Sequence, residues 1–414
     1  MATHLQRLAK EPRHPATFKA AVFPANTALE LVEVQFKEPG QNELAIKVHA
    51  CALSNNDAIS AQALLPSSKY PRTPGMAVVG EVVALGTAGS APSSPTSPSH
   101  REGGGNGKLS SMMSKLTLGK MGHGKKSAAG EGNFKVGDKV IATFDHQGLA
   151  EYCTAHVPHT AHVSPGYESL DQLVAATSGA RVLTAYNRFA ETKKRRSEEM
   201  KKALAVRDEE IGFKGEGVVV VYGEGGYARM ALTAISLAAP EKLTDQRVVL
   251  VTPSDRFSHD DYRIPERDML VVGKQNVAEE LKAMGGVALV IATGQPGYGF
   301  NKVLDSMRHG SEVVLLTLAG KGIVDLNIGP ILARSLTLIA APLASGPQMR
   351  RALAFLESHD IRKHIKIHTL DFTVQGVNEA WELARKKDTM LAPVVVFGYK
   401  GGLTEQAAAG VGTA

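Results

Sequence analysis

Apolar positions follow two different patterns along the chain. Up to about residue 160, short apolar runs such as 44–50, 78–85 and 136–142 are separated by turn residues, a pattern that predicts the hairpins of a mainly β domain. From residue 218 onward, apolar strands alternate with segments of helical spacing, which predicts a parallel sheet with helices on both faces. The pattern therefore indicates the α/β fold class, with a β-rich domain followed by a doubly wound domain.

The doubly wound part contains five expected strands, at 218–222, 247–251, 268–272, 288–291 and 312–316. Helices are expected at 170–189, 276–284 and 300–309. Mixed charges in 191–199 favour a solvent-exposed extension of the first helix over a nucleic-acid surface. Beyond residue 345 the chain is helical around a strand at 364–368, and the apolar run 394–397 predicts a strand that returns to the β domain.

Composition marks the segments that lie outside these domains. Residues 87–132 are dominated by Ser, Pro, Gly and Lys, and such a segment buries too little apolar surface to offset the entropy lost on ordering, so a disordered insertion is expected. The chain then divides into a flexible arm (1–16), a β-rich catalytic domain that holds the insertion (17–179) and the doubly wound domain (180–346). A return to the catalytic domain (347–399) and a disordered tail (400–414) follow.

Charge and cysteine content narrow the classes of function. The formal net charge is +6, but six basic and two acidic residues lie within 87–132, so no general nucleic-acid surface is expected. The two cysteines are too few for a disulfide framework or a cysteine-rich zinc site. No apolar run approaches the roughly 20 residues of a membrane span, and the N-terminus lacks the apolar core of a signal peptide. We expect a cytoplasmic protein without a nucleic-acid or membrane partner.

Residues 218–232 contain the best single indication of function. A run of β-branched residues leads into glycines and then into an Ala- and Leu-rich segment, which is the strand, turn and helix order of a dinucleotide-binding unit. Gly223, Gly225 and Ala228 fill its three small-residue positions, and Gly226 lies among them. The N–H groups at the start of the helix would bind the pyrophosphate. An ordinary strand-to-helix corner without a nucleotide has the same pattern.

Five motifs in order resemble the medium-chain dehydrogenase/reductase superfamily. Residues 74–82 are similar to its P-G-H-E-x-x-G-x-V segment, 136–140 to its V-G-D-x-V turn and 149–152 to its A-E-Y strand. Residues 182–186 are similar to its G-L-T-A-Y helix and 223–228 to its glycine turn. Together they cover most of 17–399 outside the insertion. The resemblance implies a GroES-like catalytic domain and a Rossmann domain that binds NADPH or NADH.

The chain departs from the resemblance where a catalytic zinc would be held. In the zinc-dependent alcohol dehydrogenases of the superfamily, three residues hold the metal, and the matching positions here hold Ser54, Met76 and Ala180. A catalytic zinc needs three protein ligands with N, S or carboxylate donors, so neither this zinc nor the cysteine-rich structural zinc is expected. Cys51 lies three residues too early to replace a ligand, and a small buried core residue is the favoured interpretation.

The zinc-free branch of the superfamily, which includes quinone oxidoreductases and enoyl reductases, fits these departures. A conjugated acceptor spreads the developing charge into an enolate that hydrogen-bond donors can hold without a Lewis acid. We expect Ser54, Asn55 and Tyr186 to be pocket donors, with Asn56 as a further candidate, while turn chemistry alone also explains Ser and Asn in this segment. The resemblance implies that Thr184 lies near the nicotinamide.

The end of the second strand of the Rossmann domain predicts the preferred nicotinamide. Thr252 occupies the position of the acid that reads the ribose, and a neutral hydroxyl there removes the repulsion that a 2′-phosphate would meet. Ser254 and Arg256 could bind that phosphate, which favours NADPH over NADH. A shift of one residue would instead make Asp255 a ribose acceptor.

The sequence thus predicts a zinc-independent, NADPH-preferring reductase of a quinone or an α,β-unsaturated carbonyl. The resemblance implies a homodimer that pairs through the apolar segment 323–342. The alternative is a catalytically idle relative that binds a regulatory partner through 87–132. It is favoured by Glu224, an anion in the glycine turn, and by Pro393 and its neighbours, which replace a motif that often carries an arginine for the pyrophosphate.

Overall fold

The computed structural model describes residues 14–24, 28–54, 56–57, 71–86, 133–144, 147–163, 173, 179–242, 246–297, 299–317, 326–340, 343–359, 366–386 and 390–398. The segment 87–132, the tail 400–414, most of the N-terminal arm and Asn55 lie outside these residues. Within them, no helix is both long and apolar enough to cross a membrane.

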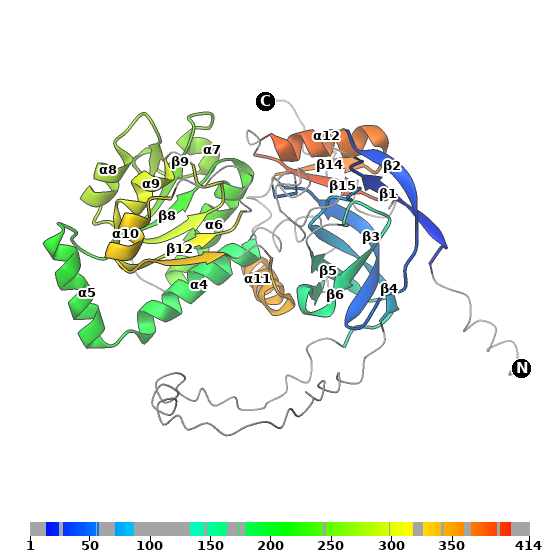
Figure 1. Cartoon of the computed structure of the whole chain (residues 1–414), viewed down its shortest axis with the longest axis horizontal. Coiled ribbons are helices and arrows are strands. Elements are labelled where there is room, and N and C mark those ends of the chain that lie inside the picture. Colours follow the sequence, from blue (N-terminus) through cyan, green and yellow to red (C-terminus); the bar gives the residue numbers. More distant parts are fainter. Residues whose placement is uncertain are drawn as a thin grey trace, which may run out of the picture.

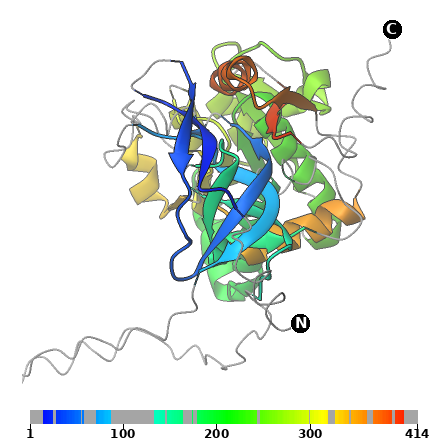
Figure 2. The ribbon, with the colours of Figure 1, turned by 90° about the vertical axis from the view of Figure 1, so that its right-hand side faces the viewer.

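The β-rich domain consists of a seven-stranded sheet and a separate two-stranded hairpin. The sheet has the order β14-β15-β3-β4-β5-β7, with β6 also paired to β3, and the hairpin pairs β1 with β2. Figure 2 shows this hairpin, in dark blue, in front of the sheet. The strands are β1 (Thr17–Val22), β2 (Glu30–Gln35), β3 (Glu43–Ala52), β4 (Ala77–Leu85), β5 (Lys139–Thr143), β6 (Tyr152–His156), β7 (Thr160–His162), β14 (Ile367–Asp371) and β15 (Ala392–Val396). Because β15 pairs antiparallel with β3, the C-terminal part of the chain completes the sheet that the N-terminal part begins.

The second sheet has six strands, all parallel, in the order β10-β9-β8-β11-β12-β13. They are β8 (Val218–Tyr222), β9 (Val248–Thr252), β10 (Met269–Val271), β11 (Val287–Ala292), β12 (Met307–Leu315) and β13 (Thr337–Ala340). The chain adds strands on one side of β8 and then crosses to the other, which is the order of a doubly wound dinucleotide-binding sheet with its switch point between β8 and β11. The predicted fold class is confirmed.

Helices cover the parallel sheet and connect the two domains. They are α4 (Ala180–Arg195), α5 (Glu198–Glu210), α6 (Gly225–Lys242), α7 (His259–Tyr262), α8 (Val277–Ala283), α9 (Phe300–Leu304), α10 (Ile328–Ala333), α11 (Gly346–Ser358) and α12 (Val374–Arg385), with short 3-10 turns η1 (Val157–His159) and η3 (Glu266–Asp268). In Figure 1 the parallel sheet lies on the left, the antiparallel sheet on the right, and α11 between them. Helix α11 packs on both α4 and β7, so it joins the two domains.

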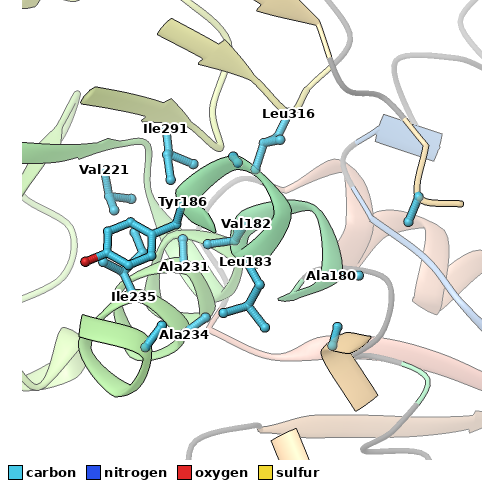
Figure 3. Close-up of a cluster of buried hydrophobic side chains, with 14 of the residues drawn as sticks. Ala180, Val182, Leu183, Tyr186, Val221, Ala231, Ala234, Ile235, Ile291 and Leu316 are labelled. Atoms are coloured by element: carbon cyan, nitrogen blue, oxygen red, sulfur yellow. The ribbon is translucent and has the colours of Figure 1, made fainter. Parts of the chain in front are cut away.

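One apolar core runs through this junction. It contains Ala50 from the antiparallel sheet, Val221 from the parallel sheet, and side chains of α4 and α6. In Figure 3, Tyr186 of α4 lies among Val221, Ala231 and Ile235. The apolar face of α4 is therefore covered from both sides.

The predicted extension of the first helix through residue 199 is wrong. Helix α4 ends at Arg195, and the backbone of Arg196 is extended, with φ −63° and ψ 135°. Ser197 then begins a second helix, α5, because its side chain accepts a hydrogen bond from the N–H of Met200. A serine satisfies a free N–H group better as an N-cap than it stabilises a helix interior.

The predicted helix at 300–309 is also too long. Helix α9 ends at Leu304, and Met307 begins β12, where it pairs with Val287 of β11. Met307 is fully buried in the core of the parallel sheet. Pairing with a distant strand decided the conformation here, and a short apolar run does not reveal such pairing.

Candidate active site

A cavity of about 460 Å³ lies between the two domains, at the carboxyl ends of the parallel strands. On one side it is lined by Gly223 and Thr293, which follow β8 and β11. On the other side it is lined by Ser54, which follows β3, and by Met390, which precedes β15. This is the crevice at the switch point where doubly wound sheets bind their ligands.

The turn between β8 and α6 has a backbone that requires glycine. Gly223 and Gly225 have φ values of +152° and +73°. A Cβ atom on Gly223 would lie 2.3 Å from the Thr293 hydroxyl oxygen, and one on Gly226 would lie 2.9 Å from the carbonyl oxygen of Met390. The turn therefore has no side chain at its three glycines, and α6 begins there with first-turn N–H groups that have no partner carbonyl within the helix.

Two buried contacts hold the turn in place. The N–H of Gly225 donates to the hydroxyl of Tyr262 in α7 at 3.0 Å. Burial raises the pKa of Tyr262 to about 12, so this hydroxyl stays protonated at neutral pH. Ala228 is fully buried, and its small side chain allows α6 to pack closely on the sheet.

A chain of hydrogen bonds links the end of β9 to the glycine turn. The hydroxyl of Thr252 donates to the carbonyl oxygen of Ser254 at 2.9 Å, and the hydroxyl of Ser254 donates to the Glu224 carboxylate at 2.6 Å. Arg256 is exposed. Among the described residues, those that line the cavity include Glu224 but not Thr252, Ser254 or Arg256. Of these four residues, only Glu224 of the glycine turn faces the cavity.

Asp255, the alternative ribose acceptor, is exposed and has a partner of its own. Its carboxylate lies 2.6 Å from the ammonium group of Lys274. The hydrogen bond from Lys274 lowers the pKa of Asp255 below its ordinary value. A ribose hydroxyl at this carboxylate would therefore compete with Lys274.

On the opposite wall of the cavity, Asp57 holds the segment that follows β3. Its side chain is buried and accepts hydrogen bonds from the N–H of Ser54 at 2.7 Å, the hydroxyl of Ser54 at 2.9 Å and the N–H of Gly75 at 3.0 Å. Burial raises the pKa of Asp57 to about 6, and the hydrogen bonds from Ser54 and Gly75 act in the opposite direction. Ser54 lines the cavity, as do Asp57 and Met76.

Asn56 lines the cavity next to them and connects the two domains. It is 3% exposed, and its side-chain amide donates to the carbonyl oxygen of Leu316, just beyond β12, at 3.2 Å. The structure therefore brings Ser54 and Asn56 together at the cavity.

Tyr186, which the sequence predicts to be a pocket donor, lies in the apolar core. Tyr186 is 2% exposed and packs in the core between α4 and α6 (Figure 3). It is not among the described residues that line the cavity. Thr184, on the same helix, does not line it either, and its hydroxyl donates to the carbonyl oxygen of Ala180 at 2.7 Å. The rotation of α4 about its axis, which its contacts with α6 determine, turns both side chains away.

Sequence reasoning missed four basic side chains that line the cavity: Arg181, Arg229, Lys366 and Lys386. The guanidinium of Arg181 lies 5.4 Å from the ring centre of Tyr227 and donates to the carbonyl oxygen of Leu316 at 3.0 Å. Arg229 directly follows the last small residue of the glycine fingerprint, a signal that was present in the sequence. Nothing in the sequence near the two lysines indicates that they reach the cavity.

The amino-acid sequence is similar to a known domain family and to several oxidoreductases. Residues 40–95 match the model of the alcohol dehydrogenase GroES-like domain. The chain is 22% identical over 370 residues to the alcohol dehydrogenase patD of Penicillium expansum, covering 89% of this chain and 94% of that protein. It is 24% identical over 392 residues to an acryloyl-coenzyme A reductase of Sulfurisphaera tokodaii, covering 89% and 97%.

The fold agrees with these relatives. The structure of a short chain alcohol dehydrogenase (rspB) from E. coli CFT073, in complex with NADH, superposes with a TM-score of 0.60, at 14% identity over 92% of this chain and 100% of that chain. The chain has the fold of the medium-chain dehydrogenase/reductase superfamily. Its GroES-like domain contributes one wall of the cavity, and its Rossmann-like domain contributes the other.

Three residues were expected at the zinc positions of the superfamily: Ser54, Met76 and Ala180. Ser54 and Met76 line the cavity, and Ala180 is fully buried at the start of α4. Within the described residues, no group of three or more His, Cys, Asp or Glu side chains could hold a metal ion. Cys51 is fully buried in the apolar core of the β domain, as the sequence predicts.

Proposed function

We propose that this chain is an NADPH-preferring oxidoreductase that reduces a quinone or an α,β-unsaturated carbonyl without zinc. The observation that carries the oxidoreductase assignment is the position of the cavity, between the GroES-like domain and the switch point of the Rossmann-like sheet. Two relatives that extend over most of the chain, an alcohol dehydrogenase and an acryloyl-coenzyme A reductase, support the same class.

The residues at the start of α6 fit a nicotinamide dinucleotide. At Gly223, Gly225 and Gly226 the turn carries no side chain that would block the approach of a diphosphate, and the first-turn N–H groups of α6 supply donors. When bound, the reduced nicotinamide supplies the hydride. The protein contributes binding, orientation and the exclusion of water between its two domains.

The donors on the GroES-like wall support a conjugated substrate. Ser54, Asn56 and Arg181 line the cavity, and the single hydroxyl proton of Ser54 is donated to Asp57. Hydrogen-bond donors and a cation stabilise a delocalised enolate, whereas an isolated alkoxide depends more strongly on a Lewis acid. We therefore assign Ser54 and Asn56 to substrate binding, with Asn55, which lies outside the described residues, as a further candidate.

The preference for NADPH rests on Thr252 and Arg256, since a neutral residue at the end of β9 does not repel a 2′-phosphate and an arginine can bind it. Glu224 acts in the opposite direction, because its carboxylate reaches the same turn through Ser254. The balance between the positive charge of Arg256 and the negative charge of Glu224 decides the choice of cofactor.

A catalytically idle member of the superfamily is the second candidate. Glu224 favours it, because this acid lies in the turn against which the phosphates would rest. Such a protein would retain the fold and lose affinity for both nicotinamides.

Titration of the purified chain with NADPH and NADH, followed by calorimetry, tests both candidates. The oxidoreductase assignment expects micromolar or tighter binding of NADPH, and absence of binding of either cofactor would favour the idle protein. Arg256→Ala should weaken NADPH more than NADH, while Glu224→Gln should strengthen NADPH more than NADH. Equal changes for the two cofactors would contradict the assigned preference. Metal analysis of the same sample is expected to find less than one zinc per chain.

We further propose that the protein is a homodimer that pairs through the β13 edge of the parallel sheet. Ile328 and Leu332 of α10 are 64% and 74% exposed, and Leu338 of β13 is 37% exposed. No strand among the described residues pairs with the outer edge of β13. Apolar side chains exposed next to such an edge are typical of a surface that another chain covers.

A further inference from the structure

Arg229 is a buried cation whose charge is poorly compensated. It lies in the second turn of α6, is 4% exposed and lines the cavity. Its Nε atom is buried and has no hydrogen-bond partner. A buried charge without a hydrogen-bonded partner destabilises the folded protein, so this side chain needs an anion that the described part of the chain does not supply.

The charges around Arg229 do not supply that anion. Asp261 attracts the guanidinium from the exposed N-terminal turn of α7, where its Oδ2 accepts the N–H of Ser258 at 2.9 Å and the hydroxyl of Ser258 at 3.0 Å. Arg263 repels the guanidinium, and Lys366 lies close enough to Asp261 to share its charge. Burial lowers the pKa of Arg229, and Arg263 lowers it further.

The cavity places this cation beside two other features that attract anions. Lys366 lines the same cavity. Gly225, Gly226 and Tyr227 of the first turn of α6 line it as well, so the positive end of the helix dipole lies at the cavity. A ligand that satisfies the helix N-terminus and two basic side chains together carries more than one negative charge.

We propose that Arg229 binds the diphosphate of the dinucleotide, together with Lys366 and the first-turn N–H groups of α6. This inference rests on the proposed function. Arg229 is assigned to the diphosphate and not to the 2′-phosphate because it lies on α6, at whose first turn a diphosphate would rest. A 2′-phosphate would lie at the turn after β9, where the Ser254 hydroxyl donates to the Glu224 carboxylate. Arg229 lies instead on the side of α7 and β14, next to Asp261 and Lys366.

Binding of NADPH, NADH and ADP-ribose to wild type, Arg229→Met and Arg229→Lys tests the proposal. ADP-ribose carries the diphosphate but neither the 2′-phosphate nor the nicotinamide. We expect Arg229→Met to weaken all three ligands by about 10- to 100-fold, the usual effect of losing hydrogen bonds to a charged group. Arg229→Lys should restore part of the affinity. Arg207→Met, on the exposed face of α5, is the matched control and should change none of the three.

The thermal stability of the ligand-free variants separates binding from a structural role. Removal of an uncompensated buried charge should leave the melting temperature of Arg229→Met unchanged or raise it, whereas loss of a structural ion pair would lower it. Unchanged affinities in Arg229→Met, or a loss confined to NADPH, would overturn the diphosphate assignment. If wild type itself binds none of the three ligands, the proposed function fails. If wild type binds them and Arg229→Met binds them equally well, only the diphosphate assignment fails.

Discussion

Asp57 is the residue on which the GroES-like wall of the cavity depends. It is 2% exposed and accepts three hydrogen bonds, two from Ser54 and one from the N–H of Gly75. Burial nevertheless raises the pKa of its carboxyl from 3.8 to about 6. The folded protein therefore holds a proton on Asp57 more tightly than the unfolded chain does.

The pKa of Asp57 predicts a pH dependence of stability. The stabilisation of the folded state by the raised pKa of Asp57 is fully present below pH 3.8 and is lost as the pH rises to about 6. The free energy of unfolding changes by up to about 3 kcal/mol over this range. Asp57→Asn removes the ionisation, so the difference in free energy of unfolding between wild type and variant should fall with rising pH in this window. Urea unfolding at several pH values measures it, and a difference that stays constant or rises would contradict the prediction.

At the scale of elements, α5 is attached to the parallel sheet through a polar contact. Asp208 is the buried residue of α5. It accepts hydrogen bonds from Arg308 Nε at 2.8 Å and from the N–H and Nδ1 of His309 at 2.9 and 3.0 Å. Since the rest of α5 is largely exposed and the helix lies at the edge of the molecule (Figure 1), this cluster positions the helix against β12.

Asp208→Ala should destabilise the protein by about 3 kcal/mol, because it leaves the largely buried Arg308 without its carboxylate partner. Urea unfolding measures the loss. Glu210→Ala, at the exposed end of the same helix, is the control and should change stability by less than about 0.5 kcal/mol. An equal effect of both substitutions would show that α5 is not held by Asp208.

At the scale of the whole molecule, the β13 edge and α10 form the surface proposed for dimerisation. Leu332→Asp introduces a charge into its most exposed apolar position, and a buried unpaired charge opposes association. Light scattering with size-exclusion chromatography should find a dimer for wild type and a monomer for the variant. Val206→Asp, at a 55% exposed position on α5, should leave the dimer intact. A monomeric wild type would contradict the proposal.

The sequence by itself determined the fold class and the glycine turn. The strand from Val218 to Tyr222, the turn and the start of α6 depend on neighbours within one segment, so β-branched residues, glycines and small residues in order were enough to predict them. Ser54 and Asn56, which the resemblance suggested as pocket residues, line the cavity, and their role in substrate binding stays a prediction.

Only the tertiary structure decided which side chains face the cavity. Tyr186 turned into the core, because the packing of α4 against α6 sets the rotation of that helix. Met307 joined a strand, because Val287 of β11 was available to pair with it. Arg229 and Lys366 reached one cavity from distant parts of the chain. Local patterns predict the elements, but the orientation and charge environment of a side chain depend on contacts between segments far apart in sequence.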